Sequence, residues 1–307
     1  MNRLLLPFLL LLFALAACQD ASDSTGEETT TAATAEGPGE ENYDGLPDNP
    51  VPGRKYRGPD GKTHMVIEAT PWPVGQDDYY PAAPGFNEAG SDRRAIMVAD
   101  SVVKHHGGYT AYENIRYLTW TFFGRRTLTW DKLAQRVRIE SPGDETIYLL
   151  DYSGEAPAGR VRIAGEEVTD SIALAEALAK ANSIFINDSY WLVQQFKLKD
   201  SGVTLKHLED SVIDPQATRP CHVLELTFDA VGDTPQNKYH LYVDMATYRI
   251  NTWQFFRNAT DEEPAMETSW ENYLPYEGIA LSGRRSDFSL EPIGVAYEKA
   301  DKVFTEF

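Results

Sequence analysis

Cysteine is nearly absent from this sequence, since the 307 residues contain only Cys18 and Cys221. Two cysteines allow one disulfide at most, and Cys18 follows an N-terminal hydrophobic run that indicates a separate role for it. No disulfide is therefore expected. Cys221 lies in an apolar segment, where a cysteine usually serves as a small buried hydrophobic residue. A reactive thiol is the alternative interpretation of Cys221.

Positive charge is also scarce. The chain has 28 Lys and Arg residues against 47 Asp and Glu residues, a formal net charge of −19 at pH 7. This balance argues against a partnership with nucleic acid, for which a basic patch is expected. Residues 19–50 contain no Lys or Arg and are rich in Thr, Ala, Gly and Pro. Such a segment buries too little apolar surface to offset its ordering entropy, and we expect a disordered acidic tether.

Catalytic and cofactor motifs are missing. The sequence has no Gly-x-Ser-x-Gly elbow, no His-Glu-x-x-His helix and no glycine-rich dinucleotide fingerprint. His105 and His106 offer a candidate catalytic or metal-binding pair, although a cationic side chain is favourable at a helix C-terminus in any case. His222 and His240 could face each other on neighbouring strands, but no carboxylate or cysteine completes a metal site. We expect no enzyme, no cofactor and no metal.

Long hydrophobic runs are limited to one, at the N-terminus. Arg3 precedes the apolar run Leu4–Leu15, which is too short for a permanent membrane span of about 20 residues. Residues 1–17 are thus expected to be a secretory signal peptide. Leu15-Ala16-Ala17-Cys18 resembles a bacterial lipobox, which implies that Cys18 carries the lipid anchor, a palmitate-type acylation. The expected organisation is a signal peptide (1–17), the lipidated cysteine and tether (18–50), an irregular arm (51–90) and one domain (91–307).

Hydrophobic periodicity predicts an α+β domain. Ser91–His106 has apolar residues at helical spacing and stops at two glycines, which predicts a helix lying on a sheet. Ser171–Asn182 predicts a second helix, and a short helix or turn is expected from Asp188 to Phe196. Segments with alternating apolar residues predict about ten antiparallel strands. These segments are 115–123, 126–131, 136–140, 146–151, 160–163, 221–228, 237–256 (two strands), 267–273, 279–288 and 296–307.

Large aromatic residues are the most suggestive feature of the predicted strands. Those singled out as candidate ligand-binding residues are Trp120, Phe122, Trp130, Trp191, Phe228, Trp253 and Phe255. They could simply fill the core beneath the helices. Alternatively, a curved sheet that is only partly covered would use them to hold an acyl chain or another apolar ligand.

Three segments resemble the LolA/LolB/RseB-like superfamily of periplasmic lipoprotein carriers and sensors, and Bacteroidetes-type lipoproteins in particular. They are Asn187–Leu192, Tyr239–Thr247 and Trp270–Tyr273, in this order. The resemblance implies a strongly curved antiparallel half-barrel whose mouth is capped by helices, with a concave face that can hold lipid.

The function expected from these features is that of a membrane-anchored, non-enzymatic envelope lipoprotein. Its half-barrel would bind an apolar ligand, an acyl chain or a lipidated partner. The alternatives are a structural or protein-interaction module of the envelope without a ligand cavity, and an enzyme that uses His105 or His106. Because Gln19 stands where some lipoproteins carry an Asp that retains them at the inner membrane, we expect location at the outer membrane, facing the periplasm or the cell surface.

Overall fold

The computed structural model describes residues 55–57, 63–65, 72–229 and 233–307. The chain divides into two compact units, Met1–Ile67 and Glu68–Phe307. The described part of the first unit is a two-stranded antiparallel sheet of β1 (Lys55–Arg57) and β2 (Thr63–Met65). All other described helices and strands belong to the second unit. The predicted signal peptide, Cys18 and the tether lie outside the described residues.

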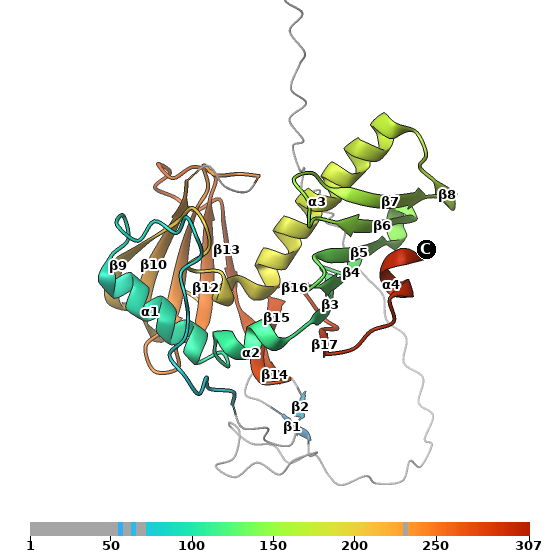
Figure 1. Ribbon diagram of the computed structural model, residues 1–307. Helices are drawn as coiled ribbons and strands as arrows, with labels where there is room; N and C mark the ends of the chain where they lie inside the picture. Colours follow the sequence, from blue (N-terminus) through green and yellow to red (C-terminus); the bar gives the residue numbers. More distant parts are fainter. Residues whose placement is uncertain (1–54, 58–62, 66–71, 230–232) are drawn as a thin grey trace, which may run out of the picture. The chain divides into compact units, whose positions relative to one another are not determined.

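The largest sheet of the second unit has seven antiparallel strands in the order β17-β3-β4-β5-β6-β7-β8 (Figure 1). They are β3 (Tyr117–Phe122), β4 (Arg126–Asp131), β5 (Arg136–Ser141), β6 (Thr146–Asp151), β7 (Ala158–Ile163), β8 (Glu166–Glu167) and β17 (Gly294–Ala296). One row of register partners crosses the sheet and is buried throughout: Trp120, Leu128, Ile139, Tyr148 and Val161. Because side chains alternate along a strand, this row defines the face of the sheet that packs in the core.

A second sheet has five antiparallel strands in the order β13-β12-β11-β10-β9. They are β9 (Val203–Ile213), β10 (Pro220–Phe228), β11 (Lys238–Asp244), β12 (Ile250–Phe256) and β13 (Met266–Ser269). Leu224, Leu241 and Trp253 are register partners across three strands, and all three are buried. The predicted meander is present in β10, β11 and β12, but the segment predicted as its last strand, 267–273, is divided between β13 and the first strand of another sheet. The strand β9, at its edge, was not predicted.

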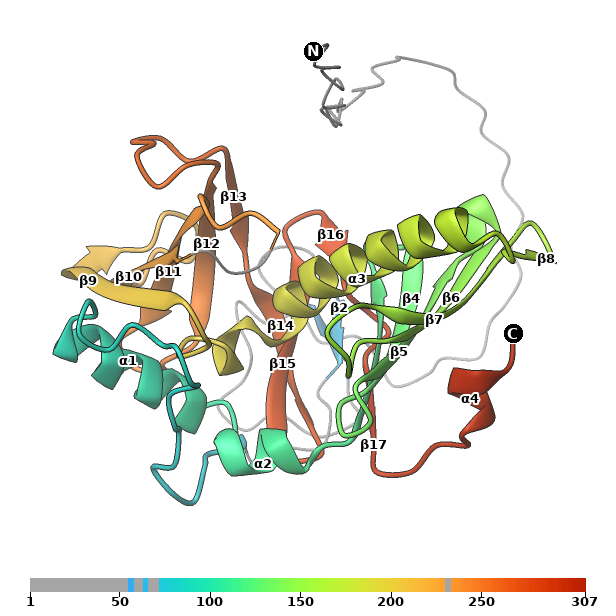
Figure 2. The same cartoon turned by 45° about the horizontal axis from the view of Figure 1, so that its top comes forward.

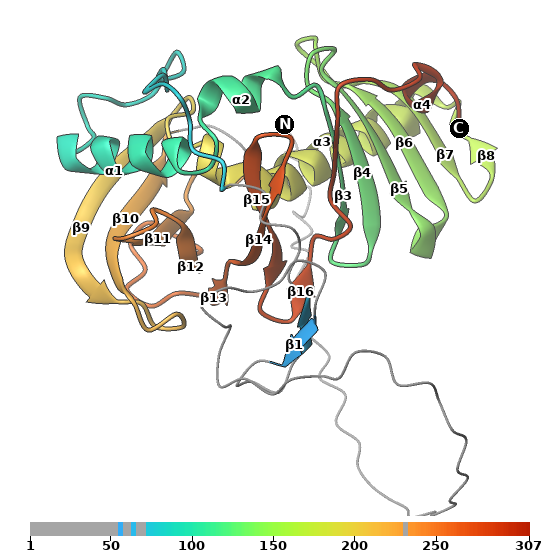
Figure 3. The ribbon, with the colours of Figure 1, turned by 90° about the horizontal axis from the view of Figure 1, so that it is seen from below.

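A third sheet contains β14 (Glu271–Tyr276), β15 (Ile279–Arg285) and β16 (Phe288–Ser289). Figure 3 shows it between the two larger sheets. The α+β class with antiparallel strands is confirmed, but the strands form three sheets rather than one sheet of about ten. Only Trp270 separates β13 from β14. Its side chain is buried, so the chain leaves the five-stranded sheet where this indole turns into the core.

Within the described residues, four α-helices accompany the sheets, together with two short 3-10 helices, Pro142–Asp144 and Gln194–Phe196. The α-helices are α1 (Arg93–Lys104), α2 (Tyr109–Asn114), α3 (Ser171–Val193) and α4 (Lys302–Thr305). α1 packs against β9, whereas α3 packs against β6 and β7 and reaches β15 (Figure 2). The helix predicted at 91–106 is confirmed. Gly107 follows it with φ of +108°, and a Cβ there would lie 2.2 Å from the carbonyl oxygen of Gly278, so the position requires glycine. Within the described residues, none of the helices has the length and apolar character needed to span a bilayer.

Two sequence predictions about local structure were wrong. α3 does not end near Asn182 but continues to Val193, because Leu178, Phe185 and Leu192 extend one buried stripe at seven-residue spacing. The strand predicted at 296–307 is instead the end of β17 followed by α4. The aromatic ring of Phe304 lies 6.0 Å from that of Tyr117. The apolar side chain of Phe304 therefore packs from α4 against β3 and does not belong to a strand.

Candidate ligand-binding site

The last turns of α3 are surrounded by aromatic rings from both large sheets. The ring of Trp191 lies 4.7 Å from that of Trp253 on β12 and 5.3 Å from that of Phe123, which follows β3. Phe122 stacks on Phe123 with a centroid distance of 4.0 Å. Edge-to-face and offset contacts at such distances stabilise aromatic pairs beyond their buried area. One turn of α3 therefore holds the two sheets together through aromatic contacts.

Tyr190 extends this group along the five-stranded sheet. Its ring lies 5.6 Å from that of Tyr239 and 6.4 Å from that of Phe228. Tyr239 in turn lies 5.2 Å from Trp253, and Phe255 lies 5.9 Å from Trp253. We call the continuous group of rings the aromatic cluster. It consists of Phe122, Phe123, Tyr190, Trp191, Phe228, Tyr239, Trp253 and Phe255.

The aromatic cluster thus brings together five of the residues singled out from the sequence, and two lie apart from it. Trp120 is wholly buried in the core of the seven-stranded sheet. Trp130 is half-buried, its ring lies 5.2 Å from that of Phe185, and its indole Nε1 donates to the Tyr152 hydroxyl at 2.6 Å. A ligand could therefore contact Trp130, which is partly exposed, but not Trp120, which is enclosed in the core.

A pocket of about 400 Å³ opens beside Trp130, between β4, the loop after β6 and α3. Asn182, Phe185, Ile186, Ser189 and Tyr190 contribute its helical wall. Their spacing of three and four residues places them on one face of α3. Trp130 and Tyr152 form the opposing wall, while Glu155 and Lys197 add charge to the lining. Since Tyr190 belongs to both, the pocket adjoins the aromatic cluster.

Another pocket, of about 230 Å³, lies between α1 and residues 77–80. Its lining includes three carboxylates, those of Asp77, Asp78 and Asp100, together with Lys104. Lys104 is paired with Asp78. This pocket is smaller than the pocket beside Trp130 and has four charged residues in its lining against two.

Buried charges fix α3 next to the pocket. Asp188, which has no exposed side-chain surface, receives two hydrogen bonds from Arg126 of β4, at 2.6 and 2.8 Å. Burial raises the pKa of the Asp188 carboxyl, and the Arg126 guanidinium opposes that rise. Arg285 of β15 is also wholly buried, donates to the Trp191 carbonyl oxygen at 2.5 Å and covers the Trp270 ring at 3.5 Å. Both arginines therefore position the turn of α3 that carries the aromatic cluster.

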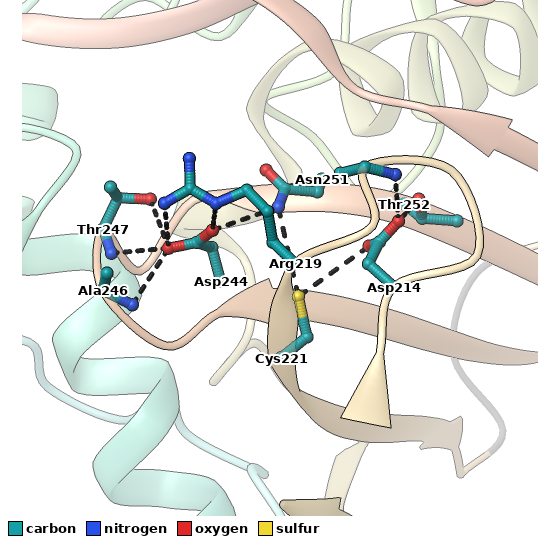
Figure 4. A network of polar contacts seen from close by, with 9 residues as sticks. Asp214, Arg219, Cys221, Asp244, Ala246, Thr247, Asn251 and Thr252 are labelled. Carbon is teal, nitrogen blue, oxygen red and sulfur yellow. Dashed lines mark hydrogen bonds and ion pairs between the residues drawn. The ribbon is translucent and has the colours of Figure 1, made fainter. Parts of the chain in front are cut away.

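Cys221 is a buried residue of β10, as the packing interpretation predicted (Figure 4). Its sulfur lies 3.8 Å from the Asp214 carboxylate and 4.0 Å from the Asn251 amide. Burial, reinforced by the charge of Asp214, raises the pKa of the thiol to about 12. The thiolate is the nucleophilic form of cysteine. Cys221 is therefore protonated at neutral pH and poorly suited to a reactive role.

The two histidines at the end of α1 do not form a catalytic pair. His105 is half-buried, and its ring lies 4.8 Å from that of Tyr248. His106 is wholly buried, and its Nδ1–H donates to the Val102 carbonyl oxygen at 2.7 Å. Burial lowers the pKa of His106 to about 4. No substrate can reach this ring without a rearrangement of the core, so a structural role fits His106 best.

Replacing His106 by phenylalanine is expected to flatten the acid side of the stability profile. The unfolded chain takes up a proton at this histidine below about pH 6.5, whereas the folded protein does so only near pH 4. The contribution of His106 to the free energy of unfolding is fully present above the unfolded pKa. As pH falls toward the folded pKa, this contribution decreases by about 3 kcal/mol in total. Urea unfolding from pH 7 to pH 4 measures this slope. An unchanged slope in the variant would contradict the assignment.

Sequence reasoning missed several residues of the site. Phe185, Ile186 and Ser189 line the pocket because α3 continues past the predicted end. Arg285 stands in a predicted strand, and alternation alone does not distinguish a buried arginine from a solvated one. The aromatic dipeptide Tyr190-Trp191 was the available sequence signal for the part that α3 contributes to the cluster.

Comparisons with known proteins found no matching family model and no matching curated protein. Among solved structures, the chain is similar to a DUF1329 family protein from Desulfovibrio piger, at 13% identity and a TM-score of 0.40, covering 69% of this chain and 97% of that one. It is also similar to a structure described as an outer membrane lipoprotein-sorting protein domain from Vibrio parahaemolyticus, at 13% identity, a TM-score of 0.37 and coverage of 69% and 96%. A third is MucB in complex with MucA, at 15% identity, a TM-score of 0.18 and coverage of 69% and 60%.

Proposed function

We propose that this protein is a lipid-anchored, non-enzymatic protein of the cell envelope that holds an acyl chain, or the acyl chain of a lipidated partner, beside α3. The pocket next to Trp130 carries this proposal. Its volume of about 400 Å³ lies within the range of about 300–1,000 Å³ found for small-molecule sites. Such sites are mostly apolar with a few polar groups, which matches aromatic walls accompanied by Glu155 and Lys197.

We further propose that the three sheets form the wall of an open half-barrel, with α3 lying along its concave side. This arrangement is supported by the aromatic contacts of α3 with both large sheets. Acylation of Cys18 would fix the domain to a membrane, proposed to be the outer membrane, with residues 19–50 as the spacer. Two or more acyl chains at one site give stable anchoring.

A charge placed in the pocket should weaken ligand binding without unfolding the protein. Ile186 lines the pocket and is 38% exposed, so Ile186→Glu puts a carboxylate against a bound chain at moderate folding cost. We expect a fluorescent fatty acid to bind the full-length protein and to bind Ile186→Glu at least about 10-fold more weakly, as about 1.4 kcal/mol implies.

Ile172→Glu is the matched control, because Ile172 lies on the same helix, is 71% exposed and is not among the residues that line the pocket. It should bind the probe like the wild type. Mass spectrometry of solvent extracts and of the intact chain would identify co-purified lipid and an acylated Cys18. If the wild type binds no acyl probe and carries no lipid, the protein-interaction module becomes the better explanation.

A further inference from the structure

Two histidines and one aspartate converge at the edge of the five-stranded sheet. His207 and Asp210 belong to β9, and His222 belongs to β10. The Asp210 Oδ1 atom lies 2.6 Å from Nδ1 of His222 and 3.1 Å from Nε2 of His207. The two ring nitrogens are 3.5 Å apart. Three atoms able to ligate a metal thus face one another at one point.

Irregular strand pairing produces this convergence. Residues three apart on a regular strand point to opposite faces, which would separate His207 from Asp210. The register between β9 and β10 slips twice here, with the partners His207–Leu224, Glu209–Val223 and Val212–Cys221. Asp210 and Ser211 therefore together oppose His222, and Ser211 has a φ of +59°. Such bulges re-aim side chains and are frequent beside functional sites.

Neighbouring groups hold the three side chains in place. Arg94 of α1 binds the second oxygen of Asp210, Oδ2, at 2.5 Å and leaves Oδ1 directed at the rings. The Tyr248 ring lies 6.1 Å from that of His222 and is inclined to it by only 22°. The imidazoles are 8–9% exposed and the Asp210 side chain is 41% exposed. The cluster is thus enclosed on the imidazole side and open to solvent on the carboxylate side.

We propose that His207, Asp210 and His222 form an open three-ligand site for a divalent transition-metal ion, best suited to Zn²⁺. Two imidazole nitrogens and one carboxylate oxygen are the donor set of open zinc sites, whose fourth position is left to water or a ligand. Zinc bonds of about 2.0–2.2 Å place two tetrahedral ligands about 3.3–3.6 Å apart. The separations of 2.6, 3.1 and 3.5 Å need only sub-ångström adjustment to reach this geometry.

The metal-ligand candidates in the structure are thus His207, Asp210 and His222, and not the pair of His222 and His240 that the sequence suggested. His222 lies opposite Val243 and His240 lies opposite Glu225, so these two rings do not face each other. His240 Nε2 is instead 3.1 Å from the Glu225 carboxylate. His207 and Asp210 could not be recognised from spacing, because the bulges on β9 are not encoded in an alternating pattern.

Titration of the full-length, tag-free protein with Zn²⁺ tests this proposal. Isothermal calorimetry should show one site, and Co²⁺ should give visible absorption bands of a low-coordinate site. His222→Ala and Asp210→Asn should each weaken Zn²⁺ binding by at least about 10-fold, since even outer partners of metal ligands are worth about 10- to 100-fold. His240→Ala, which removes a histidine–carboxylate pair from the same sheet, should leave the affinity unchanged.

Three results would overturn the site. They are the absence of saturable Zn²⁺ binding to the wild type, equal affinity in Asp210→Asn and wild type, and an equal loss in His240→Ala. Asp210→Asn keeps the shape of a half-exposed side chain, so it separates loss of a ligand from loss of the fold. Circular dichroism of each variant verifies folding. Because the pocket beside Trp130 shares no residue with this cluster, failure here leaves the acyl-chain proposal unaffected.

Discussion

Replacing Arg126 by methionine is expected to lower the free energy of unfolding by about 3–5 kcal/mol at neutral pH. Arg126 supplies both hydrogen bonds that join β4 to the Asp188 carboxylate, which has no exposed surface. Methionine fills similar space but leaves that carboxylate buried without its ion-pair partner. A loss of this size is a large part of the stability of an ordinary domain.

The effect should depend on pH in a defined direction. Burial already raises the pKa of Asp188, and the variant lacks the guanidinium that opposes this rise. The unfolded chain releases the Asp188 proton above a pKa of about 3.9, whereas the folded variant keeps it up to its higher, folded pKa. The stability of the variant therefore falls as pH rises from the unfolded pKa to the folded pKa. The difference from the wild type should be smaller near pH 4.5 than at pH 7.

Arg125→Met is the matched control, since Arg125 is the neighbouring residue and is exposed. Chemical denaturation of the three proteins at both pH values measures the difference. A loss below about 1 kcal/mol in Arg126→Met, similar to that of an exposed ion pair, would show that Arg126 and Asp188 contribute little as a pair.

Trp120→Ala is expected to destabilise the fold by about 3–5 kcal/mol through the cavity that it leaves. Trp120 begins the buried row that crosses the seven-stranded sheet and has no exposed surface. Trp130→Ala, on the adjacent strand, should cost less stability because its indole is only half-buried. Trp130→Ala should instead weaken binding of the acyl probe, because its ring lines the pocket.

Denaturant unfolding and probe titration on both variants separate these roles. Comparable loss of stability in the two variants, with unchanged binding in Trp130→Ala, would mean that both indoles are core residues. That result would favour an envelope module with a closed interior over a ligand carrier.

Alternation of apolar residues predicted most strands correctly, because successive side chains point to opposite faces of a sheet and a strand with one buried face is apolar at every second residue. Trp120, Leu128 and Ile139 illustrate this agreement. The helix at 91–106 was equally evident from its spacing and its glycine stop. Local signals sufficed for these elements, each of which has one face against the core.

Features that depend on distant partners escaped prediction. Asp188 looked like the start of a short helix, yet Arg126, sixty-two residues earlier, makes it a buried residue within α3. The change from the five-stranded to the three-stranded sheet falls at one residue, the buried Trp270. The cluster of His207, Asp210 and His222 depends on bulges in β9. A bulge is defined by the pairing of a strand with its neighbour, so it cannot be recognised from the residues of β9 alone.

The buried thiol of Cys221 has a practical consequence. Among the described residues it is the one cysteine, and it forms no cross-link. Folding of the second unit therefore needs no oxidant, no thiol exchange and no isomerase for disulfides. No disulfide of this unit depends on the redox state of its surroundings, and a cysteine introduced on its surface would give a single accessible thiol for spectroscopic labelling.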